Sequence, residues 1–452
     1  MCNMKSDIQE SRRPFLSLSI TSGAVLGDTR EAGRIVCIET ARDGSQRVYR
    51  EDRKRGSFIV DEDAMTHKRR LDNVIADYLL PQGYPDSVAP QYQKYMMWRG
   101  IQYFFGGALS VLTTRSLLKS LGVANKHSGE AAAAINWVVK DGAGRMGRFL
   151  FARWGRNLDC ELKQFRLAGD LLMEAGASLE LVTALAPRFF LPLACTANLA
   201  KNLAAVAASS TRAPIYRTFA KSNNMADITA KGESVANLSD VFGTAFGILL
   251  AKAKLPTIPL FIGLSVGYLI ASRKEVDSVE LPYFNRARLS YATNKFFTTG
   301  NAPTIEEGNT REPLLPWSDP CYSRVVLGAS VEEACESPEA FDRVVSLFSK
   351  SDYMLSYRQD TKKVYVMLKN KATPETIFRG AFVAQLYLHI VNGGDLHVRK
   401  KQYMVDKRGD PLRFVSKYGD AIFKDFENKV LSHGWRTKLT MLNTYDSRIS
   451  SM

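Results

Sequence analysis

The central part of the chain, residues 71–299, places apolar and polar side chains with the period of an α-helix. Within Leu158–Val182, leucine or phenylalanine recurs every seventh residue, and charged side chains occupy the opposite side. This spacing predicts an amphipathic helix. A similar pattern predicts a helix over Met225–Lys252, with Asn224 capping its first-turn amides and Asp227 complementing its dipole. Further helices are expected at Tyr92–Leu121, Phe189–Ser209 and Phe284–Thr298.

The two ends of the chain follow other patterns. Two β-prone runs flank Asp43-Gly44, a dipeptide that favours a β-hairpin turn. Residues 300–320 are rich in proline, glycine and charge, which is typical of a linker. A small α+β module is expected beyond it, with helices at Glu339–Phe348, Pro374–Val391 and Asp410–Leu431 and strands at Tyr353–Tyr357 and Val364–Leu368.

One run inside the helical region, Leu255–Ala271, carries no charge. It is slightly shorter than the ~20 residues that span a bilayer, and basic residues flank it as interfacial anchors do. The pairs Gly243/Gly247 and Gly263/Gly267 each place two glycines four residues apart, a spacing that permits close helix contact in lipid or in a protein core. The sequence leaves open a membrane-embedded segment and a buried hairpin of a soluble bundle.

A G-x-G-x-x-G sequence, formed by Gly142, Gly144 and Gly147, lies within AINWVVKDGAGRMGRFLFARW. In a dinucleotide-binding fold it follows a strand, and an acidic residue ends a second strand about 20 positions later. Here the preceding run, EAAAAINWVV, is a strong helix former, and Asp170 lies within a predicted helix. We therefore expect the glycines to lie in a helix and to make room for a neighbouring helix.

The charges beside these glycines suggest a local polar site. If the helix continues through this region, Asp141 and Arg145 are partners at i, i+4, and Lys140 and Arg145 line a charged pocket. The expected fold is mainly α, a glycine-notched helical bundle with an N-terminal β-hairpin and a small C-terminal α+β module. The expected domains are 1–70 (tail and hairpin), 71–299 (helical domain), 300–320 (linker) and 321–452 (α+β module).

A second polar cluster lies between Ser210 and Glu233. Arg212 precedes Ala213-Pro214, where a turn is expected. Asn224, Asp227 and Lys231 follow around a helix start, and exposed amides beside basic side chains can bind an anion. An ordinary connection between helices with surface charges is the alternative.

The composition restricts the classes of molecule that the protein is expected to bind. The net charge of +15 and the pI of about 9.4 favour acidic partners such as anionic lipid or a phosphorylated ligand. The basic clusters are not interleaved with aromatic residues, so we expect no nucleic-acid partner. The six cysteines and five histidines are dispersed, and we therefore expect no disulfide framework, no metal site and no cofactor.

Four segments resemble the root UVB sensitive family of plants and other eukaryotes. They read PQGYPDSVAPQY (Pro81–Tyr92), INWVVKDGAGRMGR (Ile135–Arg148), LDCELKQFRLAGDLL (Leu158–Leu172) and STRAPIYRTFAKSNNMADITAKGES (Ser210–Ser234). The resemblance runs from about Leu71 to Lys252 and continues more weakly through the C-terminal module. Two positions depart from the family pattern: Thr218 stands where relatives often have histidine, and GESVANL replaces a denser polar cluster after Lys231.

The resemblance implies roles in UV-B response, seedling development and vitamin B6 homeostasis, with membrane or plastid association and the cytosol as the alternative location. It implies no catalytic activity. The family's motif residues correspond to Lys140, Asp141, Gly144, Gly147, Arg166, Asp170, Arg212, Pro214, Asn224, Asp227, Lys231 and Glu233.

The sequence supports three functional hypotheses. The first is a non-enzymatic, membrane-associated adaptor or regulator with a protein partner, such as another family member, or membrane lipid. The others are a binding protein or enzyme for a phosphorylated molecule such as pyridoxal phosphate, with Lys140 or Lys231 forming an imine, and a membrane carrier. The expected binding residues are Lys140, Asp141, Arg145, Arg166, Asp170, Arg212, Asn224, Asp227, Lys231 and Glu233. The glycines expected in close helix packing are Gly142, Gly144, Gly147, Gly243, Gly247, Gly263 and Gly267.

Overall fold

The computed structural model describes residues 35–40, 46–52, 56–62, 76–151, 158, 160–253, 255–314, 324–394, 396, 409–438, 441–445 and 447–450. The chain divides into two compact units, Met1–Ala76 and Asp77–Met452. In the first unit, β1 (Ile35–Thr40), β2 (Gln46–Asp52) and β3 (Ser57–Glu62) form an antiparallel sheet. The predicted hairpin is confirmed and gains a third strand, and its turn at Asp43-Gly44 lies outside the described residues.

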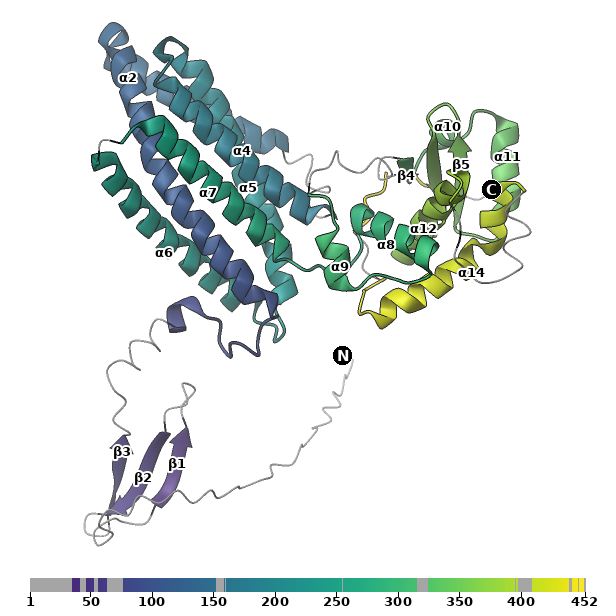
Figure 1. The fold of residues 1–452 in the computed structure, drawn as a ribbon, viewed down its shortest axis with the longest axis horizontal. Coiled ribbons are helices and arrows are strands. Elements are labelled where there is room, and N and C mark those ends of the chain that lie inside the picture. Colours follow the sequence, from purple (N-terminus) through teal and green to yellow (C-terminus); the bar gives the residue numbers. More distant parts are fainter. Residues whose placement is uncertain are drawn as a thin grey trace, which may run out of the picture. The chain divides into compact units, whose positions relative to one another are not determined.

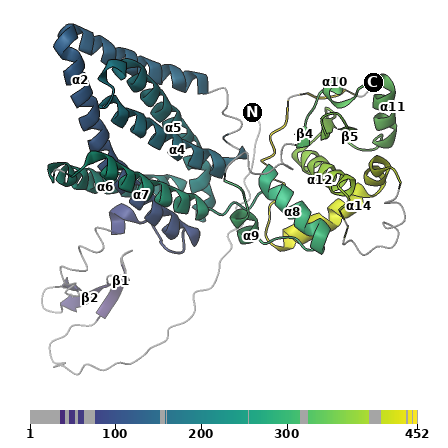
Figure 2. The ribbon, with the colours of Figure 1, turned by 45° about the horizontal axis from the view of Figure 1, so that its top comes forward.

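The second unit begins with a helical bundle (Figure 1). Its elements are α2 (Gln91–Phe151), α4 (Leu162–Thr183), the short 3₁₀ helix η2 (Pro187–Phe189), α5 (Phe190–Phe219), α6 (Met225–Lys252) and α7 (Thr257–Asp277). The helix α2 packs against α4, α5, α6 and α7, and both ribbon views show these helices side by side (Figure 2). At 61 residues, α2 runs far beyond the predicted end at Leu121, because no proline interrupts it.

The G-x-G-x-x-G residues lie inside α2, as predicted, and the residues directly before them belong to the same helix. A Cβ on Gly144 would overlap the amides of Asn198 and Asn202, and one on Gly147 would overlap Leu199. These two glycines therefore let α5 pack closely against α2. Gly142 differs, because nothing lies within 4 Å of its Cβ position, so it takes no part in close packing.

The glycines of the other two pairs also differ in whether they touch a neighbouring helix. A Cβ on Gly243 would overlap the carbonyl of Phe104, and one on Gly247 would meet the backbone of Ala108, so the backbones of α6 and α2 are in contact. A Cβ on Gly267 would meet the ring of Phe105. Gly263 has nothing within 4 Å, which contradicts the expected packing role.

Two local predictions around residues 212–224 are wrong. The expected turn at Ala213-Pro214 is absent, because α5 continues through Pro214 to Phe219. Proline inside a helix costs ~3 kcal/mol, but burial of Tyr216 and Phe219 offsets this cost. The Asn224 side chain does not cap α6; its Nδ2 donates to the Ser87 carbonyl at 3.3 Å.

The C-terminal module has the predicted α+β organisation. Its sheet has the order β4-β6-β5, with β4 parallel and β5 antiparallel to β6. Its elements are α8 (Arg286–Thr299), α9 (Ile305–Thr310), β4 (Val325–Leu327), α10 (Val331–Ala334), α11 (Pro338–Leu347), β5 (Tyr353–Arg358), β6 (Lys363–Leu368), α12 (Pro374–Val391) and α14 (Pro411–Ser432).

The core of this module also includes residues from the region that sequence analysis grouped with the bundle. Phe284 stacks on Trp435, with ring centroids 4.3 Å apart, and Phe296 of α8 packs against Phe382 and Phe426. The range expected to be a linker contains α9 and the buried residue Asn309 in its described part. The two halves of the second unit are thus joined by packed structure.

Much of the exposed surface of α6 and α7 is apolar. Exposed side chains on α6 include Val241, Phe242 and Leu249, and α7 exposes Ile262 and Ile270. Among the residues that the structure describes, two helices are long and apolar enough to cross a membrane, Pro187–Phe219 and Met225–Lys252, and only 28% and 17% of their apolar windows are buried. The run Leu255–Ala271, the sequence-based candidate, lies mostly in α7, which is not among these two.

Candidate functional site: a charged network and a cavity inside the bundle

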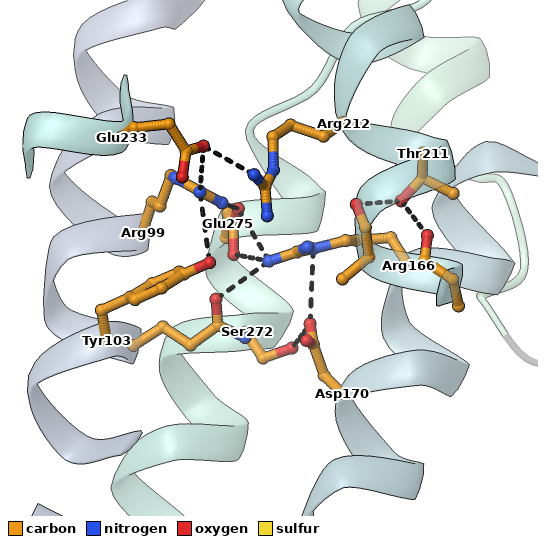
Figure 3. A network of polar contacts seen from close by, with 12 residues as sticks. Arg99, Tyr103, Arg166, Asp170, Thr211, Arg212, Glu233, Ser272 and Glu275 are labelled. Carbon is orange, nitrogen blue, oxygen red and sulfur yellow. Dashed lines mark hydrogen bonds and ion pairs between the residues drawn. The ribbon is translucent and has the colours of Figure 1, made fainter. Parts of the chain in front are cut away.

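Charged side chains meet inside the bundle (Figure 3). Arg166 of α4 donates from Nη2 to both carboxylate oxygens of Glu275 of α7, at 3.1 and 3.3 Å. Arg99 of α2 places its Nη1 3.7 Å from Glu275 Oε1. Glu275 therefore bridges two arginines that come from different helices.

This chain of charges extends in both directions. Arg99 Nη2 lies 3.4 Å from Glu233 Oε1 of α6, which also accepts from Arg212 Nη1 of α5 at 2.6 Å. On the other side, Arg166 Nε lies 3.6 Å from Asp170 Oδ2, four residues along α4. Five helices thus contribute to one central ion-pair network, defined as Arg99, Arg166, Asp170, Arg212, Glu233 and Glu275.

The centre of the network is deeply buried, whereas the side chains of Arg212 and Glu233 are 24% and 37% exposed. Arg99 and Glu275 are 0% exposed and Arg166 is 2% exposed. Removing a charge from water costs several kcal/mol of desolvation free energy. Only close opposite charges and hydrogen bonds offset this cost. Ser272 supplies one such bond, donating to Asp170 Oδ2 at 2.5 Å. Three arginines and three carboxylates balance, so the network holds the five helices in one arrangement.

The structure brings together four of the predicted binding residues, Arg166, Asp170, Arg212 and Glu233, but not the others. Asn224, Asp227 and Lys231 lie at the start of α6 and bind the 77–88 segment. There, Asp227 Oδ2 accepts from the Gln82 amide at 2.6 Å, and Lys231 donates to the Asp77 carbonyl. These polar groups hold the segment against the helix, which is the structural alternative that the sequence left open.

The remaining predicted residues lie far along α2. Lys140 Nζ is 3.3 Å from Asp141 Oδ1 and 3.7 Å from the ring centroid of Trp137. Asp141 pairs with Lys140 rather than with Arg145, which is exposed. Asn198 of α5 donates to the Lys140 carbonyl at 2.9 Å. This group therefore joins α2 to α5 and is separate from the central ion-pair network.

A cavity of about 250 Å³ lies beside the network. Arg166 and Asp170 belong to both, and the other polar lining residues include Gln102, Glu174, Lys201, Asp240 and Tyr268. Gln102 Nε2 and Glu174 Oε2 are buried and have no hydrogen-bond partner. Buried polar groups usually have partners, so this cavity has free hydrogen-bonding capacity.

Sequence analysis missed Arg99 and Glu275 of the network and the polar cavity residues Gln102, Glu174, Lys201, Asp240 and Tyr268. A weak signal exists for α2: Tyr95, Arg99 and Gln102 have spacings of four and three, which place them on the same helix face. Glu275 follows Arg273-Lys274, two of the basic residues that flank the uncharged run Leu255–Ala271. Its partner Arg166 lies 109 residues earlier, so no local pattern could show their contact.

The fold and the site define a class of α-helical proteins that enclose charges in a bundle with an apolar exterior. The chain belongs to the root UVB sensitive family. Residues 65–300 match the family model described as the vitamin B6 photo-protection and homoeostasis domain, and residues 301–451 match that of the root UVB sensitive protein C-terminal region.

Curated relatives agree with this assignment. The chain is 41% identical to protein root UVB sensitive 6 of Arabidopsis thaliana over 86% of this chain and 80% of that protein. It is 31% identical to root UVB sensitive 2, chloroplastic, of the same plant, over 84% of this chain and 86% of the relative. RUS family member 1 of Dictyostelium discoideum is 32% identical over 54% of this chain and 48% of that protein. No solved structure matches the chain.

Proposed function

We propose that this protein is a membrane-embedded, non-catalytic regulator in vitamin B6 homeostasis, and that its helical bundle sits in the bilayer. The distribution of side chains carries this proposal. In water, a bundle buries apolar residues and exposes charges. Here α6 and α7 expose isoleucine, valine and phenylalanine, whereas Arg99, Arg166 and Glu275 are enclosed.

The lengths of the elements support the same placement. The helix α6 has 28 residues, more than the ~20 that cross a bilayer. Ionisable residues within membrane helices usually face the bundle interior and pair with one another, as the central ion-pair network does. The C-terminal module, in contrast, buries its aromatic residues in a core of its own and needs no lipid contact.

A binding or regulatory role fits the network better than a catalytic one. A general base needs a free, correctly positioned group. Glu275 is held between Arg99 and Arg166, and Glu233 lies between Arg99 and Arg212. Purified protein incubated with pyridoxal, pyridoxine or pyridoxamine should therefore yield no new product by chromatography, and turnover of any of them would contradict the non-catalytic role.

Alkaline extraction tests the membrane placement. Membranes that contain the full chain are washed with carbonate at high pH, which releases peripheral proteins. The chain should remain in the pellet and dissolve only in detergent, as an integral marker protein does. Complete release into the alkaline supernatant would refute embedding.

The UV-B and seedling roles belong to the same proposal and rest on family membership. One relative carries the word chloroplastic in its name, so the proposed membrane is a plastid membrane. A fluorescent fusion of the full chain should co-localise with plastid markers in leaf cells. Uniform cytosolic signal would contradict this location, and capture of a further family member by cross-linking would identify the proposed partner.

A further inference from the structure

The cavity beside the network has an uneven charge balance. Its two cations are already engaged: Arg166 binds Glu275 and Asp170, and Lys201 binds Glu180 at 2.5 Å. Two of its carboxylates, in contrast, are not paired with a cation in this way. Glu174 Oε2 has no hydrogen-bond partner, and no described cation forms an ion pair with Asp240. The free charge facing the cavity is therefore negative.

We propose that this cavity binds a small organic amine in its protonated form. The ammonium group would donate to Glu174, which is buried, and Asp240, which is exposed, would attract the cation from outside. Gln102 Nε2 is a free donor, so the ligand also carries an acceptor such as a hydroxyl group. Charge-assisted hydrogen bonds of this kind are about twice as strong as neutral ones.

The same features disfavour a phosphorylated ligand. A phosphate group would lie near Glu174 and Asp240, neither of which forms an ion pair with a described cation, and like charges at close range repel strongly where water is excluded. Arg166 Nη2 is bound to Glu275, and the Nε of Arg166, which has no hydrogen-bond partner, lies 3.6 Å from the Asp170 carboxylate. The volume of about 250 Å³ is also below the ~300–1,000 Å³ typical of drug-sized sites, which suits an unphosphorylated metabolite. Among B6 vitamers, these properties select pyridoxamine over pyridoxal phosphate.

This proposal rests on the proposed membrane placement and vitamin B6 role, and a binding experiment on the full chain tests it separately from the alkaline extraction. The protein is placed in phosphatidylcholine nanodiscs, whose quaternary ammonium headgroups have no N–H donor, and titrated with pyridoxamine, ethanolamine, pyridoxine, pyridoxal phosphate and inorganic phosphate. Pyridoxamine should bind, and phosphate should not displace it. Nanodiscs containing phosphatidylethanolamine distinguish the source of the amine, because displacement by this lipid identifies a headgroup as the occupant.

The variant Glu174→Gln keeps the side-chain shape but removes the charge, and it should weaken amine binding on the order of tenfold or more. Asp277→Asn is the matched control, because Asp277 is an exposed bundle residue outside the cavity, and its binding should be unchanged. Circular dichroism verifies that both variants are folded. Failure of every amine to bind, tighter binding of pyridoxal phosphate or free phosphate, or equal amine binding in Glu174→Gln would overturn the proposal.

Discussion

At the scale of single residues, the bundle depends on buried opposite charges whose separation costs several kcal/mol of free energy. Arg166 and Glu275 are buried and joined by two hydrogen bonds. Their attraction balances a desolvation cost, so the pair adds little net stability compared with apolar residues of the same size. Loss of one member differs from loss of both, because the remaining charge is then buried with fewer partners.

The first prediction concerns this pair. Arg166→Met and Glu275→Met should each lower the free energy of unfolding by about 3–5 kcal/mol, because each removes the nearest opposite charge from a buried partner. The double variant should recover part of that loss, since Asp170 and Arg99 also lose a partner, and thermal unfolding in detergent measures all three. If the single variants were as stable as the unchanged protein, Arg166 and Glu275 would not be in direct contact.

The second prediction concerns acid. The Lys295 ammonium group, and then the Tyr291 hydroxyl, hold the pKa of Glu307 below its ordinary value of 4.5. A carboxyl group with a lowered folded pKa stabilises the protein above its ordinary pKa, and this contribution is lost as the pH falls through the folded pKa. Glu307→Gln should thus weaken the C-terminal module near pH 7 and flatten its acid unfolding curve below pH 4.5. The neighbouring exposed variant Glu306→Gln is the control and should keep the original acid profile in circular dichroism.

At the scale of elements, close helix contacts decide where glycine is required. The backbone of α6 touches that of α2 at Gly243, whereas Gly263 of α7 faces open space. The two residues belong to identical G-x-x-x-G patterns, so the pattern alone does not reveal which glycine is in contact.

This difference gives a matched test. Gly243→Ala should destabilise the bundle by about 1–3 kcal/mol through overpacking. Gly263→Ala should leave it unchanged or stabilise it by up to ~1 kcal/mol, because alanine is the better helix former. Thermal unfolding of the two variants side by side provides the measurement, and equal effects would refute the α2–α6 backbone contact.

At the scale of the whole second unit, a buried polar junction joins the bundle to the segments that lead into the C-terminal module. Glu312 accepts from Asn285 Nδ2 and Arg288 Nη1, each at 2.7 Å, and lies 3.9 Å from Lys163 Nζ of α4. Asn285 also donates to Glu161 at 2.6 Å. One carboxylate therefore compensates two buried cations from different parts of the chain.

The fourth prediction tests this junction. Glu312→Gln leaves Arg288 and Lys163 without their shared carboxylate and should cost about 3–5 kcal/mol. The loss should also split unfolding into two steps in calorimetry, because the two halves of the unit are no longer coupled. The exposed variant Glu332→Gln serves as the control, and a single unchanged transition in Glu312→Gln would show that other contacts couple them.

Much of the fold was predictable because its signals are local. The boundaries of α6, α12, β5 and β6 were predicted to within one residue, since periodicity and caps such as Thr373 act over a few positions. The candidate site was only partly predictable. Arg166 and Asp170 could be noticed as charges in an amphipathic helix, but their partners Glu275 and Ser272 lie about a hundred residues away.

The sequence by itself determined the family, the helical character of the glycine motif and the α+β character of the C-terminal module, because these follow from residue order and short-range spacing. Only the tertiary structure decided that α5 continues through Pro214, which glycines touch a neighbouring helix, and which charges pair inside the bundle. Such outcomes depend on burial and on contacts between distant segments, and these exist only once the helices are packed.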